Sequence, residues 1–219
     1  MIVLQHRREA KRALNSGSLL SVCVDSERLT TVVARSLAPL WHNERIAAAL
    51  RRQQHEHLSL LVLFPAPGAI SLQAAQRRVE HGERFALVVI DGTWQEAREM
   101  FAAKYEGRRE AGTAFECLAL APEDLEFLQQ GAPSFAGCRK PEGPDCLCTL
   151  EAVALALRAL EPNAERGAAL ANDLLGPLSH MVAHQTIRTD GREVHRVDRP
   201  RYVPGLSERA RKAAEAVDI

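Results

Sequence analysis

The sequence predicts an α/β fold built on a mostly parallel sheet with helices on both faces. Two observations lead to this prediction. Short runs of apolar residues alternate along the chain with longer segments of helical pattern. These runs are apolar throughout rather than at every second position, as expected for strands that are covered on both faces of a parallel sheet.

Four apolar runs are expected to form strands. The run FALVVI is the strongest of them, and LSLLVLF ends at Pro65, where a strand cannot continue to pair. The run AFECLAL is likewise closed by Pro122. The expected strands cover residues 2–5, 58–64, 85–90 and 114–120.

Segments with helical spacing lie between and after these strands. Gly82 is placed to stop one helix, and the last helix is expected to be interrupted near Gly176 and Pro177. The expected helices cover residues 39–53, 71–82, 93–104, 149–161 and 164–185.

Two of the strands end at residues that are suited to a binding site. Asp91 directly follows the strongest strand, and Phe64 and Pro65 close the strand before it. Ligands of open parallel sheets bind beyond the carboxyl ends of the strands. We therefore expect a pocket at this edge.

The residues after the strongest strand also have purely structural explanations. Thr93 followed by Glu96 forms a capping box at the start of a helix, which we expect whatever the function. Asp91 alone fits a turn, and Trp94 alone fits a core position. Their combination at a strand end favours a functional site.

Charge and hydropathy limit the class of protein. Lys plus Arg and Asp plus Glu both number 28, so bulk charge does not bind nucleic acid, although a local basic face still can. Basic clusters at 7–12, 51–52 and 188–201 are explained by such a face or by ordinary solvated surface. No apolar run is long enough for a membrane span, and the N-terminus lacks the order of a signal peptide. We expect a cytoplasmic protein without a membrane or DNA partner.

The cysteines indicate neither disulfides nor a metal. The five cysteines are an odd number at positions 23, 117, 138, 146 and 148. The last three are close together but lack paired C-x-x-C spacing, so no zinc site is expected.

The stretch DGTWQEAREMF at 91–101 resembles the signature of the DTW-domain family of tRNA-uridine aminocarboxypropyltransferases. The matching residues are Asp91-Gly92-Thr93-Trp94, Ala97-Arg98 and Met100. Three other segments are similar in order and spacing, namely LQHRREAKRALNSGSLL at 4–20, LFPAPGA at 63–69 and CRKPEGPDCLCTLEAVALAL at 138–157. The resemblance implies a DTW-type domain at 1–187, followed by an extension at 188–219 that matches nothing recognisable.

The resemblance also implies a fold and a reaction. The family is related to the SPOUT enzymes, whose α/β fold carries a C-terminal trefoil knot. Its members use S-adenosylmethionine as the donor of a 3-amino-3-carboxypropyl group, which is added to N3 of a uridine in tRNA, and they release 5'-methylthioadenosine. In bacterial relatives the uridine lies in the variable loop.

This reaction suggests roles for the matching residues. Uridine N3 carries a proton at neutral pH, and Asp91 is the acid of the signature that can accept it or orient the uracil, with Thr93 and Trp94 beside it in the catalytic turn. The donor must present its γ-carbon, rather than its methyl group, to the nucleophile. The residues expected to hold the donor are Phe64, Pro65, Ile90, Gly92, Leu147, Cys148, Thr149 and Leu150. Those expected to bind RNA are Lys11, Arg12, Asn15, Arg98, Arg139 and Lys140.

Three alternative functions stay open at this point. One is a SPOUT-like RNA methyltransferase, which shares the donor and the fold class. Another is an aminocarboxypropyltransferase that acts on ribosomal RNA. The third is an RNA-binding protein without enzymatic activity, which needs neither an acid at a strand end nor a small-molecule pocket.

Overall fold

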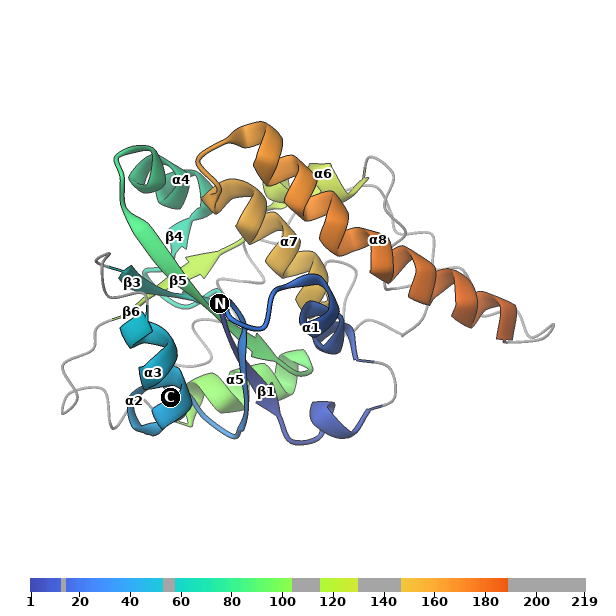
Figure 1. Cartoon of the computed structure of the whole chain (residues 1–219), viewed down its shortest axis with the longest axis horizontal. Coiled ribbons are helices and arrows are strands. Elements are labelled where there is room, and N and C mark those ends of the chain that lie inside the picture. The colour runs from blue at the N-terminus through green and yellow to red at the C-terminus, as the bar shows by residue number, and fades with distance from the viewer. Residues whose placement is uncertain (13–14, 53–57, 104–114, 130–146, 189–219) are drawn as a thin grey trace.

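The computed structural model describes residues 1–12, 15–52, 58–103, 115–129 and 147–188, and Figure 1 shows their arrangement. A six-stranded sheet forms the centre of the molecule, in the order β2-β1-β5-β3-β6-β4. Every pair of neighbouring strands runs parallel. The α/β class and the mostly parallel sheet predicted from the sequence are therefore confirmed.

The four predicted strands are all present. The sheet contains two further strands, β2 and β4, that the apolar pattern did not indicate. The sequence TTVVA of β2 holds a run of β-branched residues, which is the signal that could have revealed it. The strands are β1 (Ile2–His6), β2 (Thr30–Ala34), β3 (Leu58–Leu63), β4 (Ile70–Ser71), β5 (Arg84–Asp91) and β6 (Phe115–Ala119).

The helices follow the predicted order with several short additions. Gly82, at a φ of 89°, ends the helix before it as expected, because a residue without a Cβ adopts positive φ without strain. The α-helices are α1 (Leu20–Cys23), α2 (Pro39–His42), α3 (Glu44–Arg52), α4 (Leu72–Glu80), α5 (Trp94–Ala102), α6 (Glu126–Gln129), α7 (Thr149–Leu160) and α8 (Ala164–Arg188). Short 3-10 turns are η1 (Glu9–Lys11), η2 (Ser16–Leu19) and η4 (Pro122–Leu125).

Two helix predictions were wrong in detail. The predicted helix at 39–53 is two helices, because Asn43 is extended and its side chain accepts the N–H groups of Arg45 and Ile46 at the start of α3. The predicted break near Gly176 and Pro177 is absent, and α8 continues through the proline. The residue before a proline normally leaves the helical region because its Cβ meets the proline ring, and Gly176 has no Cβ.

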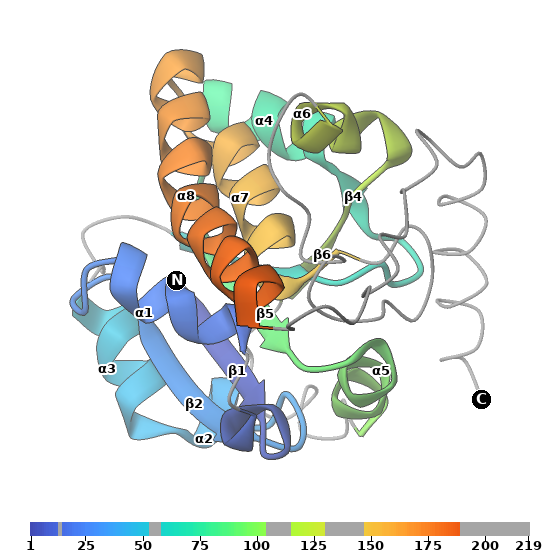
Figure 2. The ribbon, with the colours of Figure 1, turned by 90° about the vertical axis from the view of Figure 1, so that its right-hand side faces the viewer.

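Helices cover both faces of the sheet (Figure 2), and each face has its own core. Because side chains alternate along a strand, Leu87 and Val89 of β5 point to one face while Val88 and Ile90 point to the other. The first core joins the sheet to α7 and α8, which lie side by side, and the second joins it to α3 and α5. Asp91 continues the first set and therefore faces α7.

No helix in the described ranges combines the length and the apolar character that crossing a membrane requires. The extension predicted at 188–219 lies outside the described residues apart from Arg188, the last residue of α8.

Candidate active site

Asp91 lies at the carboxyl end of β5 and is only 1% exposed. The parallel pairing of β1 and β5 puts Gln5 directly beside it. Gln5 Nε2 donates to Asp91 Oδ2 at 2.9 Å, and the hydroxyl of Thr149 donates to Asp91 Oδ1 at 2.6 Å. The carboxylate thus joins β1, β5 and the first residue of α7.

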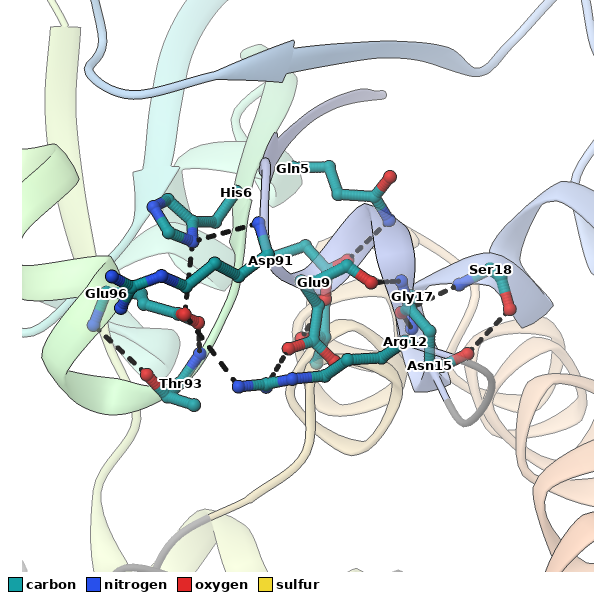
Figure 3. A network of polar contacts seen from close by, with 12 residues as sticks. Gln5, His6, Glu9, Arg12, Asn15, Gly17, Ser18, Asp91, Thr93 and Glu96 are labelled. Carbon is teal, nitrogen blue, oxygen red and sulfur yellow. Dashed lines mark hydrogen bonds and ion pairs between the residues drawn. The ribbon is translucent and has the colours of Figure 1, made fainter.

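Gly17 of η2 packs directly on this carboxylate. A Cβ at position 17 would lie 2.3 Å from Asp91 Oδ2 and 2.6 Å from Oδ1, which is closer than real Cβ contacts. Asn15 holds the glycine in place, since its side-chain oxygen accepts the N–H groups of Gly17 at 2.8 Å and Ser18 at 3.2 Å (Figure 3). The segment from Asn15 to Gly17 therefore covers Asp91.

An apolar cavity of about 130 Å³ opens beside Asp91, at the carboxyl ends of β3, β5 and β6. Seven of the eight residues predicted to hold the donor line it, and Leu150, which is fully buried in the first core, does not. The cavity is lined by Leu63, Phe64, Pro65, Val89, Ile90, Gly92, Trp94, Ala97, Leu118, Leu120, Leu147, Cys148, Thr149 and Ala152. We call it the first cavity.

Trp94, which lines the first cavity, has a buried polar atom. Its ring lies 6.5 Å from that of Phe64, which in turn stacks on Phe101 at 4.3 Å. The indole Nε1 is buried and has no hydrogen-bond partner within the described structure. A buried N–H group without an acceptor is costly, so this donor is suited to a ligand atom.

The start of α7 forms another wall of the first cavity. Cys148 caps the helix, because its Sγ accepts the N–H of Glu151 at 3.5 Å while Glu151 Oε2 accepts the N–H of Cys148 at 2.7 Å. Burial of the thiol and the charge of Glu151 raise the pKa of Cys148 well above its ordinary value. Cys148 is thus a neutral thiol at pH 7 and no general base.

The predicted capping box of α5 is confirmed and carries a wider polar network (Figure 3). Glu96 accepts the N–H of Thr93 at 2.9 Å, and its other oxygen lies 3.2 Å from Nδ1 of His6 and 3.8 Å from the guanidinium of Arg12. Burial alone would raise the pKa of Glu96. The hydrogen bonds from Thr93 and the charges of Arg12 and His6 outweigh burial and hold this pKa below its ordinary value.

The residues predicted to bind RNA have different surroundings. Lys11 and Arg98 are exposed, whereas Arg12 is ion-paired with Glu9 and Glu96. Asn15 is 5% exposed and committed to capping η2, so its side chain offers no surface to RNA. Arg139 and Lys140 lie outside the described residues.

Three neighbours of Asp91 and Glu96 were missed from the sequence. They are Gln5 and His6 at the end of β1, and Gly17. The signal that could have found the first two is their position, since the end of any parallel strand next to β5 reaches the same edge of the sheet. Within the described ranges, no group of three His, Cys, Asp or Glu side chains is placed to hold a metal ion.

Comparisons with known proteins point to one family. The DTW domain matches residues 1–186. The chain is 26% identical over 196 residues to tRNA-uridine aminocarboxypropyltransferase A of Arabidopsis thaliana. The match covers 85% of this chain and 70% of that relative. Proteins named tRNA-uridine aminocarboxypropyltransferase 2 match over 84% of the chain at 26% identity in Drosophila melanogaster and 25% in Mus musculus. The chain spans 64% and 54% of the length of these two relatives. No solved structure matches it.

Proposed function

Because the chain belongs to the DTW-domain family, we propose that it is a tRNA-uridine aminocarboxypropyltransferase. It moves the 3-amino-3-carboxypropyl group of S-adenosylmethionine to N3 of a uridine in tRNA. The observation that carries this proposal is the first cavity, which brings together residues predicted to hold the donor from three separate segments, along with Trp94 and its buried, unpartnered indole N–H.

The first cavity fits one end of such a donor. Binding sites that enclose a drug-sized ligand have volumes of about 300–1,000 Å³, whereas this cavity measures about 130 Å³. It therefore takes a planar heterocycle or an apolar chain rather than the whole donor. Its apolar walls suit the adenine ring, and Nε1 of Trp94 supplies a hydrogen bond to an acceptor of the donor.

The reaction needs a route for the N3 proton. Among the described residues, none that lines the first cavity is a carboxylate or a histidine, and the thiol of Cys148 is neutral. The hydroxyl of Thr149 lines the cavity and already donates to Asp91. Asp91 therefore acts through Thr149, whose hydroxyl takes the N3 proton while it passes its own proton to the carboxylate.

The bonds change in one displacement. Uridine N3 loses its proton and attacks the donor's γ-carbon, so that the N–C bond forms as the C–S bond breaks. The electron pair of the C–S bond goes to sulfur, which leaves as the neutral thioether of 5'-methylthioadenosine. The walls of the cavity fix which of the three carbons on sulfur faces the nitrogen.

Substitutions at Thr149 test this route. Thr149→Val keeps the shape but removes the hydroxyl, and we expect the transfer rate to fall by about 10²–10⁴-fold. Thr149→Ser keeps the hydroxyl and serves as the matched control, with a rate close to that of the parent. Equal rates in the valine and serine variants would remove Thr149 from the proton route.

Donor binding is tested at Trp94. Trp94→Phe keeps an aromatic ring but loses the N–H, so S-adenosylmethionine should bind about 2- to 12-fold more weakly, as one neutral hydrogen bond implies. Trp41→Phe, in the second core, is the control and should leave donor affinity unchanged. Isothermal titration calorimetry measures both affinities.

Product mass tests the function itself. The purified protein is incubated with S-adenosylmethionine and unmodified tRNA, and the nucleosides are weighed after digestion. A uridine heavier by an aminocarboxypropyl group supports the proposal. A uridine heavier by a methyl group indicates a methyltransferase, and unmodified uridine at saturating donor contradicts both reactions. Sequencing the modified tRNA tests our further proposal that the uridine lies in the variable loop.

The proposed function comes with three further expectations about fold and location. They are a SPOUT-like fold, its C-terminal trefoil knot and a cytoplasmic location. The parallel sheet with helices on both faces is compatible with the first. An experimental structure that traces the chain through α8 tests the first two, and cell fractionation tests the third.

A further inference from the structure

A second, larger cavity of about 560 Å³ lies on the other side of α5. It opens past the carboxyl ends of β1 and β2, where the chain leaves the sheet. α5 contributes to both cavities, with Trp94 and Ala97 in the first and Glu99 in the second. The second cavity is lined by His6, Arg7, Arg8, Lys11, Arg35, Glu99, Met100 and Ala103.

The wall of the second cavity is strongly positive. Among the described residues of the wall, Arg7, Arg8, Lys11 and Arg35 are cationic and Glu99 is anionic. This concentration occurs in a chain whose formal net charge is zero. Cations that share a concave wall repel one another, and together they raise the concentration of anions at that wall.

These four cations form no ion pair with the other described residues. The neighbouring Arg12, by contrast, is paired with Glu9 and Glu96. Arg7, Arg8 and Lys11 are exposed. Their charges are therefore available to a partner outside the described part of the chain.

The base of the cavity is held rigidly. His6 ends β1, and its Nδ1 lies 3.2 Å from Glu96, which is itself fixed by the N–H of Thr93. The same Nδ1 accepts the N–H of Arg8 at 3.4 Å. The neighbouring Gly92 belongs to the first cavity, and a Cβ placed on it would lie 3.3 Å from the Cβ of His6. The two cavities thus meet around the turn from Gly92 to Thr93.

We propose that the second cavity binds backbone phosphates of the RNA substrate close to the uridine that is modified. Arginine and lysine are the usual partners of RNA phosphates, and such contacts orient the nucleic acid without reading its sequence. The RNA then approaches α5 from one side, while the donor lies on the other side of this helix. This inference rests on the proposed function for the identity of the RNA.

A double substitution tests the proposal. Arg8→Ala together with Lys11→Ala removes two cations of the cavity, and Arg45→Ala together with Arg77→Ala removes two exposed cations elsewhere as the matched control. Fluorescence anisotropy measures the affinity of each protein for unmodified tRNA at several NaCl concentrations. Urea unfolding of both variants checks that they remain folded.

We expect the cavity variant to bind tRNA about 100-fold more weakly, since each of the two lost charged contacts is worth about tenfold. The slope of log affinity against log salt should become shallower by about 1.5, because two phosphate contacts are lost. The KM for tRNA should rise, while the thermal shift that S-adenosylmethionine produces stays as in the parent. The control variant should resemble the parent in all three measurements.

Other outcomes separate this inference from the proposed function. Equal affinity and equal slope in the cavity and control variants would overturn the inference, even if the parent modifies tRNA. Cavity-dependent binding of tRNA without any transfer would keep the inference and overturn the proposed function. Competition of tRNA binding by millimolar inorganic phosphate at constant ionic strength would show a site for free phosphate instead of the RNA backbone.

Discussion

The contact between Gly17 and Asp91 predicts a large and specific coupling between the two positions. In Gly17→Ala the new methyl group would lie 2.3–2.6 Å from the carboxylate atoms. The carboxylate has little room to move, because it is on the central strand and receives hydrogen bonds from Gln5 and Thr149. Overpacking costs about 1–3 kcal/mol, and each lost hydrogen bond to a charged group costs about 1.5–3 kcal/mol. We therefore expect Gly17→Ala to lower the free energy of unfolding by about 3 kcal/mol.

A double-mutant cycle isolates this contact. Asp91→Ala removes the atoms that the new methyl group would strike, so Gly17→Ala should cost almost nothing in that background. The coupling energy should then be about 3 kcal/mol, with the double variant more stable than the sum of the single effects implies. Urea unfolding at 25 °C with comparable m-values provides the four free energies. Effects that add to within about 0.5 kcal/mol would refute the packing of Gly17 on the carboxylate.

Three other changes have clear expected results. Cys148→Ser should stabilise α7 by up to about 1 kcal/mol in thermal unfolding, since a hydroxyl is a better helix cap than the thiol acceptor now 3.5 Å from Glu151 N. Glu96→Gln should destabilise the protein at pH 7, by an amount that shrinks as pH falls below the ordinary carboxyl range. The pKa of Glu96 is held below its ordinary value, so its carboxylate stabilises the fold above the ordinary carboxyl range and loses this effect as pH falls; urea midpoints measured from pH 7 to pH 3 check this. Gly82→Ala should cost about 1 kcal/mol in urea unfolding, because φ at this position is 89°.

Local sequence patterns predicted the four inner strands of the sheet but not its two edge strands, β2 and β4. Apolar runs specified β1, β3, β5 and β6, because a strand covered on both faces is mostly apolar. β2 is only partly buried and pairs with one neighbour, so its composition carries a weaker signal.

The predicted break of the last helix at Pro177 was wrong because only part of the local sequence was considered. The proline signal was read alone, whereas the absence of a Cβ on Gly176 decided the outcome.

The first cavity was easier to predict from the sequence than the polar network. Its lining follows from the rule that parallel strands end at a common edge, and the resemblance named the residues at those ends. The partners of Asp91 did not follow, because Gln5, Gly17 and Thr149 are distant in sequence and meet only through strand order and helix packing. Likewise, nothing in the sequence distinguished the ion-paired Arg12 from Lys11, which lines the second cavity.

The burial of Asp91 explains why the resemblance extends over separate segments rather than over one motif. A carboxylate at 1% exposure is stable only if its oxygens receive hydrogen bonds, and here the donors come from β1 and α7 while η2 closes the remaining side. A change in any of these segments leaves the charge unsatisfied or displaced. The acid at the end of β5 thus requires an amide at position 5, a hydroxyl at position 149 and no side chain at position 17. Of these groups, only the hydroxyl of Thr149 also reaches the first cavity, and this is why the proposed proton route passes through it.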